Sequence, residues 1–171
     1  MKSELSGLRV AVVHWHSSDE LASSVSHSCA ELGCESTGFS HMEKIPEAAE
    51  AVISMGPFGS LAPLARQLLA RSPSRRPLFV LWMTEQLANP ALPEFVHYPL
   101  SALRSWAERF ACRRRNGGEW ELNPSLRWLT RRANRFRYYG DLHWMRRRGI
   151  LALLAVGSRW IGAFLQARGL N

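Results

Sequence analysis

Short apolar runs rich in β-branched residues alternate along the chain with amphipathic segments, and glycine, proline or polar residues separate them. Nearly continuous apolar runs are typical of parallel strands, because helices cover such strands on both faces. The runs predict strands at residues 8–14, 34–39, 50–55, 77–82 and 150–156. Strands that alternate with helices indicate an α/β fold, and we expect a doubly wound, mostly parallel, Rossmann-like sheet with helices on both faces.

The segments between these strands carry apolar residues at helical spacing. Ser17, Ser18 and Asp19 offer N-caps for the first helix, and Gly33 offers the glycine that commonly ends a helix. Ser60 can cap a second helix, and the helix after Gly157 is expected to be the last. Each helix therefore has a start signal in the sequence.

The middle of the chain is less regular. Residues 87–100 contain three prolines and predict an ordered loop. A helix is expected at residues 101–115 and a long one at 124–148, which Gly140 can kink or interrupt. Three large apolar residues of the first of these helices are expected to face inward: Leu103, Trp106 and Phe110.

The composition is that of a single globular domain, and the charged residues are unevenly distributed along the chain. The 171 residues are 46% hydrophobic and 21% charged, which fits a single globular domain over residues 1–171. Residues 1–100 hold seven Lys or Arg and ten Asp or Glu, whereas residues 101–171 hold fifteen Arg and four acidic residues. This asymmetry indicates a basic face for phosphates, anionic lipid or nucleic acid, or else a solvated arginine-rich helix face. The candidate anion-binding residues are Arg113, Arg114, Arg115, Arg146, Arg147 and Arg148.

The three cysteines, Cys29, Cys34 and Cys112, are odd in number and form no CxxC pair. The sequence therefore predicts neither a disulfide framework nor a zinc site, and free thiols suit a reducing compartment. The N-terminus has no apolar signal-peptide core, and the apolar stretch at residues 149–157 is too short to span a bilayer. We expect a soluble, cytoplasmic protein.

The last two expected elements resemble part of a known family. Residues 154–159 (LAVGSR) and 164–170 (FLQARGL) resemble the end of the N-terminal domain of GT-B glycosyltransferases, where a strand precedes a helix with a similar ending. Residues 9–14 (RVAVVH) resemble the first strand of such domains. Residues 82–87 (WMTEQL) with Asn89-Pro90, and residues 146–156, are similar to glycosyltransferases of the glycosyltransferase-4 or CgeB-like kind.

This resemblance implies a function as well as a fold. In the family, a sugar nucleotide binds a second Rossmann domain, and no metal is normally required. The chain ends at Asn171, where the linker to that domain would begin. We therefore expect an N-terminal, acceptor-side domain that is incomplete alone, binds no cofactor by itself and needs a donor-binding domain or chain. The acceptor would be a glycan, a lipid or a small molecule.

Candidate site residues follow the expected strands, because ligands of open α/β sheets bind outside the carboxyl ends of strands. His14, His16 and Ser17 come at the end of the first strand. Imidazole changes its charge near neutral pH, so His14 is the candidate catalytic base, with His16 and Ser17 as substrate-binding residues. The alternative is a hydrogen-bonded structural histidine. A metal site is not expected, because the two histidines lack a third ligand.

Further substrate-binding candidates follow the later strands. Gly56 and Gly59 precede a helix, where glycines let a phosphate or sugar approach backbone N–H groups. Their spacing matches neither the dinucleotide fingerprint nor a P-loop, so a simple turn is the alternative. Glu85 and Gln86 can bind sugar hydroxyls or anchor a loop, and Ser158 can bind substrate or cap the last helix.

Two functions remain after these observations. The first is the acceptor-side domain of a glycosyltransferase that moves a sugar from a nucleotide-sugar donor to an acceptor hydroxyl. The alternative is a non-catalytic Rossmann-like module that binds anionic lipid or nucleic acid through its arginine-rich C-terminal half. Nucleic acid ranks below lipid because no helix-turn-helix, RNA-binding signature or zinc finger accompanies the charge. An anionic acceptor or lipid would place the protein at the inner membrane surface.

Overall fold

The computed structural model describes residues 5–16, 18–56, 60–83, 94–114, 120–123, 139–157, 159–167 and 169–170. Its elements follow in this order: β1 (Arg9–His14), α1 (Glu20–Glu31), β2 (Glu35–Ser40), β3 (Ala51–Gly56), α2 (Ala62–Leu69), η1 (Pro73–Arg75), β4 (Leu78–Met83), α3 (Glu94–Ala111), β5 (Cys112–Arg114), β6 (Trp120–Leu122), α5 (Tyr139–Arg147), β7 (Leu151–Val156) and α6 (Arg159–Gln166).

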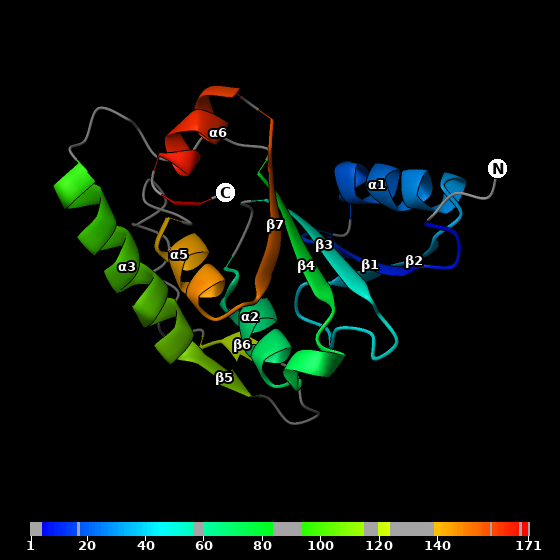
Figure 1. Cartoon of the computed structure of the whole chain (residues 1–171). Helices are drawn as coiled ribbons and strands as arrows, with labels where there is room; N and C mark the ends of the chain where they lie inside the picture. Colours follow the sequence, from blue (N-terminus) through cyan, green and yellow to red (C-terminus); the bar gives the residue numbers. More distant parts are fainter. Residues whose placement is uncertain are drawn as a thin grey trace.

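Five strands form one parallel sheet in the order β2-β1-β3-β4-β7 (Figure 1). In register, His14 at the end of β1 lies beside Ser40 at the end of β2, and Gly56 lies beside Met83. This is a doubly wound order in which the direction of winding reverses between β1 and β3. The expected Rossmann-like α/β fold is confirmed, including residues 151–156 as a strand of the sheet.

Two apolar cores lie on opposite faces of the sheet. The smaller core joins Val10 and Val12 of β1 to Ala22 of α1, and the larger core joins Val13 to Leu64 of α2. Residues that alternate along a strand face opposite sides, so α1 and α2 cover opposite faces. Figure 1 shows α1 over β1 and β2, while α2, α3 and α5 lie on the other side.

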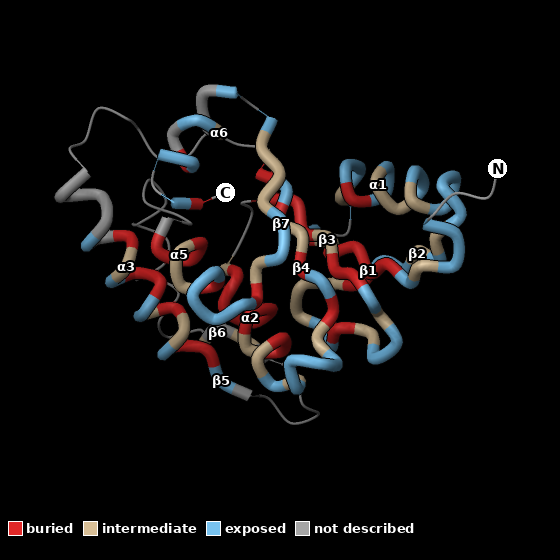
Figure 2. The backbone as a smooth tube through the Cα atoms, viewed as in Figure 1, coloured by how far each residue is buried: buried red, intermediate tan, exposed pale blue. Residues whose placement is uncertain are grey.

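On the face of the sheet that α1 covers, strands β4 and β7 have exposed side chains. Leu78 and Trp82 of β4 are exposed, and so is Leu153 of β7, which pairs with Val80 (Figure 2). Among the described residues, no helix lies over these three side chains. The apolar strands that the sequence pattern identified are therefore covered on both faces only in the half of the sheet near β1.

Two expectations for the middle of the chain are wrong. Helix α3 begins at Glu94 and contains Pro99, so residues 94–100 are not a loop. The helix expected up to residue 115 ends at Ala111, and residues 112–114 instead form β5, which pairs antiparallel with β6. Residues 87–93 of the expected loop lie outside the described residues. So do residues 124–138 of the long helix expected at 124–148, and the description resumes with α5.

The orientation of α3 also differs from expectation. Leu103, Trp106 and Phe110 were expected to face inward, and all three are exposed. The inward face instead carries Ser101 and Glu108 among other polar residues. No helix within the described part of the chain is long and apolar enough to cross a membrane.

Candidate functional site

Because the sheet is parallel, the carboxyl ends of its five strands share one edge, which we call the carboxyl edge. The strands end there at His14, Ser40, Gly56, Met83 and Val156. The winding reverses between β1 and β3, and helices α1 and α2 diverge from this point to opposite faces. Ligands of doubly wound folds bind in the crevice at such a reversal. The structure therefore brings two of the candidate residues, His14 and Gly56, to the edge where a ligand is expected.

The turn from β1 into α1 is organised by Asp19. Its Oδ1 accepts a hydrogen bond from the backbone N–H of Ala22 at 3.0 Å, and its Oδ2 accepts one from the N–H of Trp15 at 3.1 Å. The first contact is the usual N-cap of a helix, and the second ties the end of β1 to the same carboxylate. The turn that carries His16 is thus closed around one acidic side chain.

His14 lies half-buried at the end of β1, on the face that α1 covers. Its ring rests against the backbone of Gly38 in β2, because a Cβ at Gly38 would lie 2.6 Å from His14 Nε2. Any larger residue at position 38 would displace the imidazole. His16, two residues further on, is exposed, and Ser17 lies outside the described residues.

Trp15 and His41 form an aromatic pair on the opposite face of the sheet. Their rings stack with centroids 4.6 Å apart, and buried Trp15 Nε1 donates to Ser54 Oγ at 3.3 Å. The His41 backbone N–H donates to the carbonyl of His14 at 3.1 Å, so the end of β2 is joined to the end of β1. Burial and nearby His16 lower the pKa of His41, which favours its neutral form.

His41 is a neighbour of the site that the sequence did not predict. A histidine that follows a strand was a detectable signal, since the same rule identified His14. What the rule lacked was the strand order, which sets β2 next to β1. Three of the six histidines, His14, His16 and His41, therefore gather at this end of the sheet. Among the described residues, no group of three or more His, Cys, Asp or Glu side chains could hold a metal ion.

The turn after β3 is anchored to α3. Ser60 Oγ donates to Glu108 Oε2 at 2.8 Å and accepts from the N–H of Ala62 at 3.3 Å, at the start of α2. Gly56 is buried, and Gly59 lies outside the described residues. Glu85, Gln86 and Ser158 also lie outside them, so their predicted roles remain predictions.

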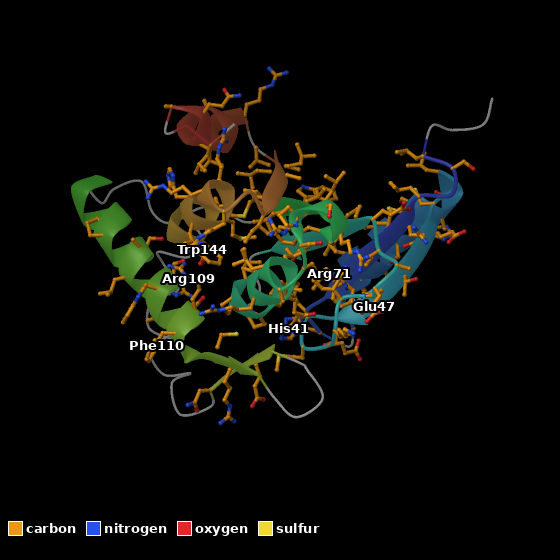
Figure 3. All side chains as sticks on the ribbon, turned by 60° about the horizontal axis from the view of Figure 1, so that its bottom comes forward. His41, Glu47, Arg71, Arg109, Phe110 and Trp144 are labelled. Atoms are coloured by element: carbon orange, nitrogen blue, oxygen red, sulfur yellow. The ribbon has the colours of Figure 1, made fainter. Side chains whose placement is uncertain are left out.

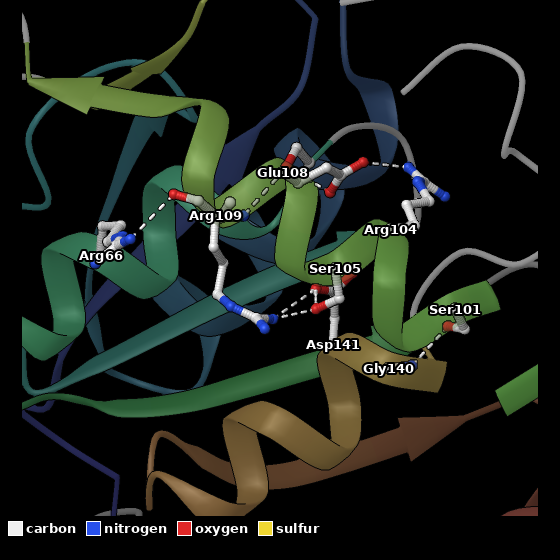
Figure 4. A network of polar contacts seen from close by, with 10 residues as sticks. Arg66, Ser101, Arg104, Ser105, Glu108, Arg109, Gly140 and Asp141 are labelled. Carbon is white, nitrogen blue, oxygen red and sulfur yellow. Dashed lines mark hydrogen bonds and ion pairs between the residues drawn. The ribbon is translucent and has the colours of Figure 1, made fainter. Parts of the chain in front are cut away.

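A buried polar network joins α2, α3 and α5 (Figure 4). Glu108 pairs with Arg104 on α3, and Ser105 donates to Asp141 of α5 and accepts from Arg109. Arg109 also lies over the ring of Trp144, 4.2 Å from its centroid. This network was not predicted, because its members come from segments far apart in the sequence.

Three of the predicted anion-binding arginines lie at the amino end of the sheet, away from the carboxyl edge. Arg146, Arg147 and Arg148 are exposed at the C-terminal end of α5, just before the amino end of β7. Arg113 Nη2 pairs with Glu121 Oε1 at 2.8 Å. Arg115 and the side chain of Arg114 lie outside the described residues. Arg146, Arg147 and Arg148 therefore lie at the opposite end of the sheet from the histidine cluster.

The carboxyl edge presents imidazole side chains, which are chemically able to accept a proton from a bound hydroxyl. Among the residues that the structure describes, this edge has no cluster of positively charged side chains that could bind a phosphate. Comparison with known proteins adds no family to this geometry: no protein-family model matches the chain, and no curated protein matches its sequence.

Proposed function

We propose that this chain is the acceptor-side, Rossmann-like domain of a GT-B glycosyltransferase, with His14 as the catalytic base. The observation that carries the proposal is the position of His14 at the carboxyl end of β1, next to the reversal of winding in the sheet. The ring is half-buried and fixed against Gly38, so it is oriented and still reachable.

The reaction assigned to this site is a displacement at the sugar. His14 takes the proton of an acceptor hydroxyl, and the oxygen forms a bond to the anomeric carbon of the donor sugar. The bond from that carbon to the nucleoside diphosphate breaks, and the diphosphate leaves with the electron pair. His16 and the turn that carries it would line the acceptor wall.

The charge of the β1–α1 turn favours an acceptor over a nucleotide at this site. Asp19 already accepts from one backbone N–H at the start of α1, that of Ala22, and from the N–H of Trp15 at the end of β1, where a phosphate would otherwise bind. A carboxylate at that position repels a diphosphate but tolerates a neutral hydroxyl. The nucleotide-sugar donor would therefore bind a second domain, on the same polypeptide or on a partner chain.

The proposal includes a cytoplasmic location. Cys29, Cys34 and Cys112 are free thiols, which persist in a reducing compartment.

Replacement of His14 by glutamine tests the assignment. The variant and the parent protein, each together with the donor-binding domain or partner chain, are assayed for transfer of labelled sugar from a panel of uridine- and guanosine-diphosphate sugars. General base catalysis contributes about a hundredfold or more, so kcat should fall by at least that factor while the donor KM stays unchanged. His27→Gln is the matched control, because His27 is exposed on α1, away from the carboxyl end of β1, where it pairs with Glu31.

Two results would remove the proposal. Equal kcat in His14→Gln and the parent would exclude His14 as the base. If the parent transfers no sugar, and mono- and disaccharides shift none of the NMR signals of His14, Trp15 and His41, the glycosyltransferase assignment itself is wrong.

A further inference from the structure

Helix α3 presents its apolar side to solvent and its polar side to the protein. Leu103, Trp106 and Phe110 are 61%, 57% and 75% exposed, whereas Ser105 and Glu108 are both 1% exposed. Figure 2 shows buried positions along the inner side of α3 and exposed positions along its outer side. In a surface helix of a globular protein the apolar stripe normally faces the core. We call Leu103, Trp106 and Phe110 the α3 stripe.

Polar contacts hold α3 in this orientation. Ser101 Oγ accepts from the N–H of Gly140 at 2.6 Å, and Ser105 donates to Asp141. Glu108 accepts from Ser60 at 2.8 Å and also pairs with Arg104. Rotating the helix to bury the stripe would break these contacts and leave polar groups of α5 and the β3–α2 turn without their partners, at a high cost. The outward direction of the stripe is therefore built into the fold.

The stripe is chemically an interaction surface. Its residues recur three and four positions apart, so they form one continuous ridge. Trp106 and Phe110 stack with ring centroids 5.6 Å apart and planes 15° apart. Figure 3 shows Phe110 on the far side of α3 from Arg109 and Trp144. Exposed apolar patches of this kind mark sites where another surface binds.

The exposed charges at the C-terminal ends of α3 and α5 are mainly positive, although Arg113 pairs there with Glu121. Helices α3 and α5 run side by side in the same direction, because Ser101 lies by Gly140 and Arg109 lies over Trp144. Their C-terminal ends therefore lie together, and Arg147 and Arg148 are exposed there. The described side chains of α3 include no exposed acidic residue. The surface complementary to this end of the molecule is anionic.

We propose that the α3 stripe docks this protein on an anionic lipid bilayer, with the aromatic rings among the upper acyl chains and the arginines at the ends of α3 and α5 against the headgroups. Tryptophan prefers the boundary between headgroups and acyl chains, and a helix can lie in that plane with one apolar face down. Each arginine near an anionic surface adds attraction that salt weakens. This inference is independent of the proposed transferase function.

A second copy of the chain fits the stripe less well than a bilayer does. Aromatic side chains bury about 150–250 Å² each, so the stripe leaves roughly 300–400 Å² uncovered. Two stripes together reach about half of the roughly 1,600 Å² of a standard interface. A lipid surface sets no such minimum area, and its anionic headgroups can lie against the basic end of α3 and α5.

The experiment is cosedimentation of the full chain with vesicles of phosphatidylcholine alone or mixed with equal phosphatidylglycerol. The double variant W106S/F110S should bind the anionic vesicles at least about tenfold more weakly than the parent. Leu103→Ser is compared with Leu78→Ser, since both leucines are 61% exposed and Leu78 lies on the sheet instead of α3. Only Leu103→Ser should weaken binding. Binding of the parent should fall in high salt and be weaker on neutral vesicles.

Urea midpoints that match the parent are expected for all these variants, because the replaced side chains are exposed. Three results would overturn the proposal. The first is anionic-vesicle binding that W106S/F110S leaves unchanged. The second is a parent protein that binds neither vesicle. The third is a parent that sediments as a dimer and becomes monomeric in W106S/F110S without binding vesicles, which would make the stripe an interface between copies.

Discussion

Replacing Asp141 by asparagine tests the charge state of the buried network between α3 and α5. Burial, and secondly the nearby Glu108 carboxylate, raise the pKa of Asp141 to about 6, against a usual value of 3.8. The hydrogen bond from Ser105 and the charges of Arg104 and Arg109 act in the opposite direction but do not cancel the effect of burial. The folded protein therefore holds this proton more tightly than the unfolded chain does.

The raised pKa sets the sign and the size of a pH effect. Protonated Asp141 contributes stability that is fully present below the unfolded pKa of 3.8 and is lost as the pH rises through about 6. Integrated from about pH 4 to about pH 7, the loss is about 2 kcal/mol for this group. Asparagine keeps the shape and an acceptor for Ser105 but cannot ionise. The free energy of unfolding of the parent minus that of Asp141→Asn should therefore fall by about 2 kcal/mol over this range.

Urea unfolding followed by far-ultraviolet circular dichroism, in a series of buffers, measures this difference. In thermal unfolding the same change amounts to about 4–8 °C in Tm for a chain of this length. Glu31→Gln is the control, because Glu31 is exposed on α1. The difference in free energy of unfolding between the parent and Glu31→Gln should change little over the same pH range. A difference for Asp141→Asn that is constant, or that grows with pH, would refute the raised pKa.

Two substitutions test close contacts. A Cβ on Gly140 would lie 2.5 Å from the carbonyl oxygen of Ser101 and 2.8 Å from Cα of Ala102, so Gly140→Ala should destabilise the protein by about 2 kcal/mol in thermal unfolding. Helix propensity alone predicts stabilisation by about 1 kcal/mol, so a raised Tm would contradict the close approach of α3 and α5. Ser54→Ala removes the acceptor of buried Trp15 Nε1 and should cost about 1–3 kcal/mol in urea unfolding. An unchanged midpoint would show that this hydrogen bond is not formed in solution.

The strands were predictable because their signal is local. A run such as Val10 to Val13 is apolar at every position, which only a strand covered on both faces explains well. The same logic located β3, β4 and β7 to within a residue or two. The parallel arrangement followed from the alternation of strands and helices, and the structure confirms it.

The orientation of α3 could not be predicted from its own residues. Helical spacing shows that Leu103, Trp106 and Phe110 share a face, but it does not show which face the protein covers. The partners that decide this, Ser60 and Asp141, lie more than thirty residues from the positions they contact. A polar inward face becomes stable only when those distant partners are present.

Some residues of the candidate site could be predicted from the sequence, and others could not. His14 and Gly56 were identified because each ends a strand, and the ends of parallel strands meet. His41 was missed because its proximity depends on β2 lying beside β1. The hairpin of β5 and β6 was missed because strands of three residues carry too short a pattern to distinguish from the end of a helix.

The thin core beneath α1 has a consequence for access to the carboxyl edge. Ala22 is the one buried residue of this helix, and Leu21 and Leu32 face solvent. Segments with few buried apolar contacts open locally at a small fraction of the free energy that unfolds the whole molecule. Asp19, which shapes the turn beside His14, belongs to the start of this segment. Local opening of α1 is therefore expected to uncover the face of the sheet on which His14 lies, while the sheet itself stays intact.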